Sequence, residues 1–150
     1  MSSPSPAFPT LPAGRRLTPQ RRLVYEALAA NDSHPDAEQL ITLVRRSDPR
    51  VSVATVYNTL RLLADAGWIL ELRGLGPKTR YDANTGDHDH FTCRACGRVE
   101  DIPVQLDAVE RLRGEGLAGY RVDSLHVHAR GLCESCAARH DTTKIRRQYV

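Results

Sequence analysis

The sequence predicts an α+β fold in two parts, in which three helices and a hairpin are followed by a smaller α/β half. Three segments before Gly67 carry apolar residues at helical spacing, whereas most later segments alternate or are interrupted by glycine. The 150 residues suffice for one large or two small domains. We expect a disordered proline-rich arm at 1–14, a first domain at 15–83, a hinge at 84–87 and a second domain at 88–150.

Composition narrows the class of protein. Hydrophobic residues make up 41% of the chain, enough for a core, while aromatic residues make up 5%, so Leu, Val and Ala must fill most of it. No apolar run approaches the ~20 residues that span a membrane, and the N-terminus lacks the apolar core of a signal peptide. We therefore expect a cytoplasmic protein whose thiols stay reduced, which favours metal binding over disulfides.

The charge is unevenly distributed along the chain. Residues 1–83 hold 11 Lys and Arg against 8 Asp and Glu, a net of +3, whereas residues 84–150 hold 10 of each. The positive surplus in the first half indicates a polyanion partner for that half.

Each of the three helices has an N-terminal signal. A side chain that can accept hydrogen bonds from the first backbone amides precedes each apolar run. These expected N-caps are Thr18 with Pro19 after it, Asp36 with Gln39 closing a capping box, and Ser52. Gly67 is expected to end the third helix.

The third helix has two distinct faces. At about 100° per residue, its inward side collects Val53, Val56, Leu60 and Leu63. The other side offers an aromatic ring, an amide and a guanidinium, from Tyr57, Asn58 and Arg61. Such groups can meet a thymine methyl, a base edge and a phosphate, although an ordinary solvated face has a similar composition.

A hairpin follows the third helix. Residues 68–72 and 79–82 have β-like composition, and glycines and a proline lie between them. Three short helices and a hairpin make a winged helix-turn-helix, whose third helix enters the major groove of double-stranded DNA. The expected contacts are Tyr57, Asn58 and Arg61 from that helix, with Arg16 or Arg21 on the DNA backbone.

The second half reads as a small α/β domain. Its expected elements are strands at 91–93 and 98–102, a helix at 103–117, a strand at 120–130 and a short helix after Cys136. These are too few strands for an independent core. Sheet pairing between two copies would supply the missing burial, so we expect a homodimer.

Four cysteines form two Cys-x-x-Cys pairs. They are Cys93 and Cys96, and Cys133 and Cys136. Two pairs with this spacing are typical of a tetrahedral structural Zn(II) held by four thiolates. The alternatives are buried free thiols or disulfides.

Histidines and aspartates form a second set of donors. His88 and His90 point the same way on a strand, Asp101 lies on the probable pairing strand, and Asp82 is a short distance upstream. His34 lies in the first domain, and sequence alone cannot bring it close. Nitrogen and carboxylate donors suit Mn(II), Fe(II) or Zn(II), and affinity order alone does not choose among them.

Five motifs together resemble the ferric uptake regulator family of metal-dependent transcription factors, over about residues 15 to 138. They are Arg16–Arg21, Ser52–Leu60, Arg80–Asp82, His88–His90 and the two cysteine pairs. The resemblance implies a winged-helix domain hinged to an α/β dimerisation domain. It is strongest to peroxide-sensing members, whose metal pentad falls on His34, Asp82, His88, His90 and Asp101, since iron-sensing members generally have Glu where this chain has Asp101.

The resemblance also implies a mechanism. In peroxide sensors, the iron form reacts with hydrogen peroxide, a histidine matching His34 or His88 becomes 2-oxo-histidine, and metal and DNA are released. The alternatives are a repressor that senses Fe(II), Mn(II) or Zn(II) concentration, a thiol switch at the cysteines, and a metallohydrolase. Leu125 stands where relatives often carry another metal-binding histidine, so His126 and His128 are not expected to complete a third site.

Overall fold

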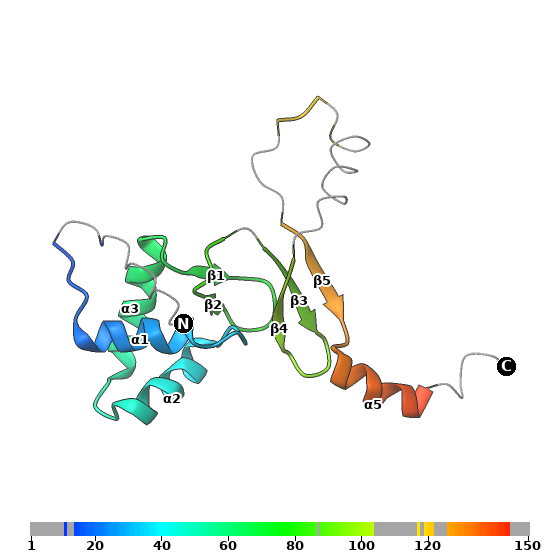
Figure 1. Ribbon diagram of the computed structural model, residues 1–150, viewed down its shortest axis with the longest axis horizontal. Helices are drawn as coiled ribbons and strands as arrows, with labels where there is room; N and C mark the ends of the chain where they lie inside the picture. Colours follow the sequence, from blue (N-terminus) through cyan, green and yellow to red (C-terminus); the bar gives the residue numbers. More distant parts are fainter. Residues whose placement is uncertain are drawn as a thin grey trace, which may run out of the picture. The chain divides into compact units, whose positions relative to one another are not determined.

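The computed structural model describes residues 11, 14–86, 88–103, 117, 119–121 and 126–144. The chain forms two compact units, Met1–Thr85 and Gly86–Val150, and Figure 1 labels their elements. Residues 104–116 of the predicted helix at 103–117, and nearly all of the predicted arm at 1–14, lie outside the described residues. The described parts confirm the α+β class, with a helical first unit and a small sheet in the second.

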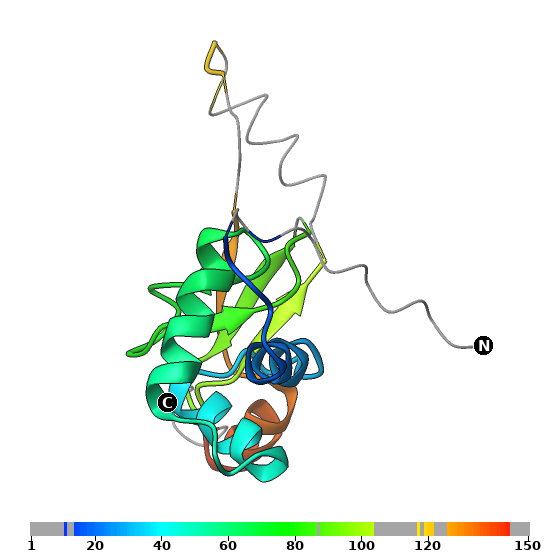
Figure 2. The same ribbon diagram turned by 90° about the vertical axis from the view of Figure 1, so that its left-hand side faces the viewer.

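Three helices form the body of the first unit, and their caps are those that the sequence predicts. They are α1 (Pro19–Ala29), α2 (Ala37–Ser47) and α3 (Val53–Asp65). Thr18 and Ser52 each accept a hydrogen bond from a backbone amide three residues on. Asp36 and Gln39 form a reciprocal capping box. Figure 2 faces this unit and shows α3 running beside α1.

The hairpin of the first unit is shorter than predicted. β1 (Leu70–Leu72) pairs antiparallel with β2 (Arg80–Asp82), and Leu70 lies opposite Asp82. Because β2 ends at Asp82, residues 68 and 69 have no partner on it. Trp68 and Ile69 are instead buried in the core, where the Trp68 ring meets the Tyr25 ring edge-on, with 5.6 Å between centroids.

One apolar core joins the three helices and the hairpin. Its fully buried members include Val24, Leu28, Leu40, Val44, Val56, Leu60 and Leu63. The prediction that Val53 faces inward is wrong, because 45% of its surface is exposed. Val53 is the first residue of α3, and Val51 just before it fills the core at that end.

A three-stranded sheet and a helix form the described part of the second unit. The strands are β3 (Asp89–Cys93), β4 (Val99–Ile102) and β5 (His128–Gly131), in the order β4-β3-β5. β3 pairs antiparallel with β4 and parallel with β5. Helix α5 (Glu134–Lys144) follows, and it begins before Cys136 rather than after it.

The predicted strand at 120–130 is too long. Residues 120, 121, 126 and 127 are not in a strand, and 122–125 lie outside the described residues. β5 pairs with β3 from His128 opposite His90, and β3 itself starts at Asp89. Because the two strands are parallel, a β5 that began earlier would extend past the start of β3 and have no partner there. Among the described residues, no helix is long and apolar enough to cross a bilayer.

Candidate metal centres and DNA-reading surface

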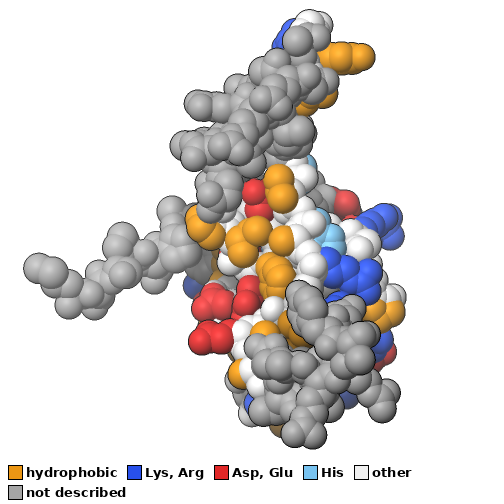
Figure 3. All heavy atoms as spheres, turned by 90° about the vertical axis from the view of Figure 1, so that its right-hand side faces the viewer, with side chains coloured by type: hydrophobic (Ala, Val, Ile, Leu, Met, Phe, Trp, Pro, Cys, Tyr) orange, Lys and Arg blue, Asp and Glu red, His pale blue; other side chains and the backbone are white. Residues whose placement is uncertain are grey.

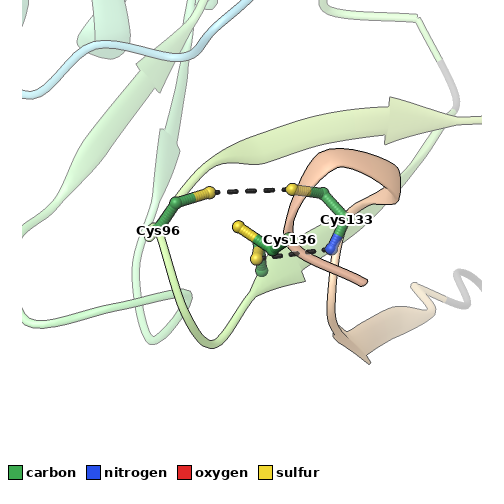
Figure 4. A group of neighbouring side chains, drawn as sticks. Cys96, Cys133 and Cys136 are labelled. Atoms are coloured by element: carbon green, nitrogen blue, oxygen red, sulfur yellow. Dashed lines mark hydrogen bonds between the residues drawn. The ribbon is translucent and has the colours of Figure 1, made fainter. Parts of the chain in front are cut away.

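The four cysteines come together in the second unit. Their sulfur atoms all lie within 4.8 Å of one another, and Cys96 Sγ is 3.8 Å from Cys133 Sγ. Figure 4 shows the sulfurs of Cys96, Cys133 and Cys136 turned toward one another from two segments. A tetrahedron of thiolates around zinc has sulfur–sulfur edges of about 3.8 Å, given Zn–S bonds of about 2.3 Å. None of the four cysteines forms a disulfide, so the donor set fits Zn(II).

Two tight turns build this cluster. In the first, Gly97 N donates to Cys93 O at 2.9 Å, and the left-handed φ of 72° at Gly97 lets the chain reverse into β4. In the second, Cys133 O accepts from Cys136 N and Ala137 N as α5 begins. Arg94 N also donates to Gly131 O at 2.8 Å, which ties the first turn to the end of β5.

The surroundings of Cys93 and Cys133 favour the thiolate form of these two side chains. The backbone amide of Cys133, which donates to Cys93 Sγ at 3.3 Å, is the main cause that lowers the pKa of Cys93 to about 6. The Ser135 hydroxyl, 3.4 Å from Cys133 Sγ, lowers the pKa of Cys133. Cys133 in turn raises the pKa of Cys136 to about 12. Four thiols this close cannot all ionise without a cation among them.

In the first unit, the structure brings His34 beside Asp82. His34 Nε2 lies 4.0 Å from Asp82 Oδ2, and the two residues are only 2% and 4% exposed. Asp82 Oδ1 accepts a hydrogen bond from Asn84 N at 2.7 Å, which orients the carboxylate. A buried imidazole next to a buried, oriented carboxylate can supply two ligands to a metal ion. Sequence spacing did not reveal this pairing.

In the second unit, three further donors converge. His88 Nε2 lies 3.0 Å from His90 Nε2 and 3.3 Å from Asp101 Oδ1, and His90 Nε2 is 3.6 Å from the same oxygen. His90 and Asp101 are opposite each other on β3 and β4, as predicted. His88 Nδ1 is 2.7 Å from Gly86 O, and donation to that carbonyl would leave Nε2 as the free ligand atom. Nitrogen and carboxylate donors of this kind suit a first-row divalent ion.

The other histidines of the second unit have different surroundings. His128 Nε2 is 2.8 Å from the Thr92 hydroxyl, His126 is exposed, and Leu125 lies outside the described residues. Asp89 Oδ1 accepts from Val127 N at 2.8 Å and so fastens the start of β5 to β3.

The outer face of α3 carries the predicted DNA-reading side chains. Tyr57 is 46% exposed, and Asn58 and Arg61 are exposed beside it. A groove of about 690 Å³ runs from these residues to Glu71 and Arg73 of the hairpin. Exposed Val53, one turn before Tyr57, adds an apolar group to this face that sequence periodicity assigned to the core.

Basic side chains gather at the start of the first unit. Arg15, Arg21 and Arg61 line a hollow of about 460 Å³ together with Asn58. Arg21 Nη1 donates to Arg16 O at 2.8 Å, so the segment before α1 is held by the helix itself. The sequence predicts DNA contacts for Arg16 and Arg21 but not for Arg15. The one feature that could have indicated Arg15 is that it precedes Arg16 in the sequence.

The profile of the ferric uptake regulator family matches residues 12–129 of the chain. The chain belongs to the ferric uptake regulator family. Its relatives include the peroxide-responsive repressor PerR of Staphylococcus epidermidis, 36% identical over 125 residues that cover 83% of each chain. Members of this family are metal-dependent transcriptional regulators and not enzymes, so the metallohydrolase alternative is set aside.

Solved structures of the ferric uptake regulator family resemble this member closely. The Campylobacter jejuni peroxide stress regulator is 32% identical, with a TM-score of 0.64 over 79% of this chain and 89% of that one. A zinc-bound manganese uptake regulator is 29% identical, with a TM-score of 0.67 over 80% and 92%. These matches confirm the fold class that the sequence predicts.

Proposed function

We propose that this family member is a homodimeric, DNA-binding transcriptional repressor controlled by a divalent metal and by peroxide. The observation that carries the proposal is a set of donors divided between the units. His34 and Asp82 belong to the unit with the DNA-reading helix, and His88, His90 and Asp101 belong to the unit with the cysteines. The 36% sequence identity to a peroxide-responsive repressor supports the proposal that peroxide controls this protein.

The cysteine cluster is proposed to hold a structural Zn(II). The sulfur separations fit a tetrahedral ion, and the cluster joins the turn after β3 to the start of α5. Such an ion contributes directly to the folding free energy of the unit that binds it.

A second ion, Fe(II) or Mn(II), is proposed as the regulatory metal. Bound by all five nitrogen and oxygen donors, it would fix the angle between the two units across the hinge at residues 84–87. Fixing that angle favours the arrangement in which both copies of α3 reach DNA, so metal and DNA bind cooperatively. The manganese uptake regulator among the similar structures is consistent with this choice of metal.

The sheet of the second unit supports a homodimer. β5 is an edge strand, and on its other side it pairs with no strand among the residues that the structure describes. Figure 3 shows hydrophobic side chains gathered down the face that carries β5, between acidic and basic groups. Val127, just before β5, is 37% exposed. Covering by another element is one way in which native proteins protect such an edge, and a second copy would cover it.

Peroxide is proposed to act on a ligand histidine. A bound Fe(II) would give one electron to cleave the O–O bond and take one back from the ring after oxygen has added to it, so the metal would end as Fe(II) and peroxide would be the net oxidant. Overall, one peroxide oxygen forms a bond to the ring carbon between the two nitrogens, the hydrogen of that carbon moves to nitrogen, and the other oxygen leaves as water. The resulting 2-oxo-histidine has lost its basic lone pair, so the ion and then the DNA are released.

The first expected result is an oxygen adduct on His34 or on the peptide with His88 and His90. Protein loaded with zinc and Fe(II) is treated with equimolar peroxide, digested and analysed by mass spectrometry. The Mn(II)-loaded protein, given the same peroxide, is the control and should remain unmodified. Loss of DNA binding should follow the adduct with the same time course.

Two other outcomes would show that the protein senses a different signal or senses it at a different site. If the iron form keeps all its histidines intact while DNA binding follows the free metal concentration, the protein is a metal-concentration sensor. If zinc leaves the cysteines before any histidine is modified, the switch is the thiolate cluster.

Replacing Tyr57 by alanine should weaken specific DNA binding by about tenfold to a hundredfold, because one base contact contributes about 1–3 kcal/mol. The measurement compares binding to duplexes that the wild-type protein enriches from random DNA. Tyr120→Ala, which removes an exposed ring from the other unit, is the matched control. Equal loss of DNA binding, dimerisation and metal loading in Tyr57→Ala would contradict the role.

A further inference from the structure

The strand β2 is fastened to the segment that leads into α2. Arg80 Nη1 donates to His34 O at 3.0 Å, and Tyr81 N donates to Pro35 O at 3.1 Å. Asp36 and Arg80 form an isolated antiparallel bridge. The segment that contains His34 therefore lies along the edge of β2, and all of these contacts are within the first unit.

His34 has an unusual backbone conformation. Its φ of 49° makes it the one non-glycine residue with positive φ among those that the structure describes. A side chain with a Cβ pays about 1–3 kcal/mol for this left-handed conformation. Pro35 follows, which further restricts the backbone of His34. Such a conformation persists only where surrounding contacts hold it, and the carbonyl of His34 has such a contact in Arg80.

The spacing of Arg80 and Asp82 explains why both reach His34. Residues two apart on a strand point to the same face. Arg80 contacts the backbone carbonyl of His34, and Asp82 faces its imidazole at 4.0 Å. One residue of β2 thus holds the conformation of His34, and the other completes the pair of metal donors.

We propose that Arg80 is a positioning residue for the regulatory metal. Its guanidinium keeps His34 in the left-handed conformation that presents Nε2 beside Asp82, so the half-site in the first unit is formed before the ion arrives. Preorganisation of this kind raises affinity because binding no longer has to order the ligand. The inference rests on the proposed regulatory site, and it adds a residue that does not touch the ion.

The test uses the full-length, zinc-loaded protein and titrates it with Co(II), whose visible absorption reports the ligands and geometry of the second site. Arg80→Gln should lower Co(II) affinity by about 10- to 100-fold, the usual cost of losing an outer contact to a ligand. It should also change the band shape while zinc content stays at the wild-type level. Arg80→Lys, which can still donate to the carbonyl, should restore part of the affinity.

Lys78→Gln is the matched control. Lys78 lies just before β2 and pairs with Asp36 at the N-terminus of α2 and with Glu38 in its first turn, but it makes no contact with the His34 carbonyl. Its Co(II) affinity should stay within about twofold of wild type. A loss as large as that of Arg80→Gln would show that general tethering of the segment matters, and would overturn the specific role of Arg80.

A second measurement does not depend on metal. In metal-free protein, the NMR signals of the His34 ring should shift and broaden in Arg80→Gln and stay unchanged in Lys78→Gln. The proposal is overturned if Arg80→Gln binds Co(II) with wild-type affinity and leaves the His34 signals unchanged. In that case the loss of Co(II) binding in His34→Ala would show that the regulatory site itself still stands. If His34→Ala also binds Co(II) normally, then the proposed regulatory site fails as well.

Discussion

Replacing Cys133 by serine is expected to leave the second unit without zinc and unfolded. A structural zinc site contributes about 10–16 kcal/mol to folding, and a whole domain is stable by only about 5–15 kcal/mol. Losing the ion therefore exceeds what the rest of the unit can offset. The expected measurement is zinc content by elemental analysis, together with the thermal unfolding of wild type and variant.

The composition of the second unit explains why the effect should be so large. Its buried core cluster, among the residues that the structure describes, consists of Cys93, Cys133 and Cys136, with Phe91 and Leu132 packed against it. In the described part of the first unit, the core contains 13 buried apolar residues. In small domains with few apolar residues, a metal commonly supplies the missing stability.

Ser135→Ala is the control for this prediction. Its hydroxyl lies 3.4 Å from Cys133 Sγ, so the change perturbs the same sulfur without removing a ligand. It should retain zinc and unfold close to the wild-type temperature. A Cys133→Ser variant that unfolds at the wild-type temperature and still dimerises would show that the cysteines do not stabilise the fold.

Local signals are sufficient to predict the helices of the first unit. Thr18, Asp36 and Ser52 each satisfy backbone amides within three residues, so their effect does not depend on the rest of the chain. Strand limits depend on a partner. Trp68 and Tyr120 lie in segments that look β-like, but Trp68 lies past the end of its antiparallel partner β2, and Tyr120 lies before the start of its parallel partner β3.

The two halves of the candidate metal site also differ in whether local sequence signals predict them. His88, His90 and Asp101 come together through strand alternation and one hairpin, both of which are visible in the sequence. The pairing of His34 with Asp82 depends on a loop lying along β2, which is a long-range backbone contact without a sequence signal. Only the family resemblance predicts His34 as a ligand.

Asp82→Asn and Asp101→Asn are each expected to abolish metal-dependent DNA binding, although the two residues belong to different units. Each change removes a charged donor and keeps the shape of the side chain. If one ion is shared, zinc-loaded wild type binds one Mn(II) per chain, and each variant loses more than about a hundredfold in affinity for that ion. The two changes together should cost less than the sum of their separate effects.

Controls are available beside each residue. Glu100→Gln alters the neighbour of Asp101 on β4, which pairs with Arg98 instead of the histidines. Glu71→Gln alters β1 opposite Tyr81, and Glu71 pairs with Arg73. Both should bind Mn(II) as wild type does. Wild type that binds two Mn(II) ions, with each aspartate variant losing one and keeping the other, would show two independent sites.

The one-ion outcome is the one expected if the metal acts through the angle between the two units. An ion changes a conformational equilibrium only through a difference in its affinity for the two conformations. His34 and Asp82 would keep their separation if the units turned about the proposed hinge, and so would His88, His90 and Asp101, since each set lies within one unit. An ion held by either set alone has equal affinity for every hinge angle. Only an ion held by both sets can approach the roughly 10⁴-fold preference that moves a population from 1:99 to 99:1.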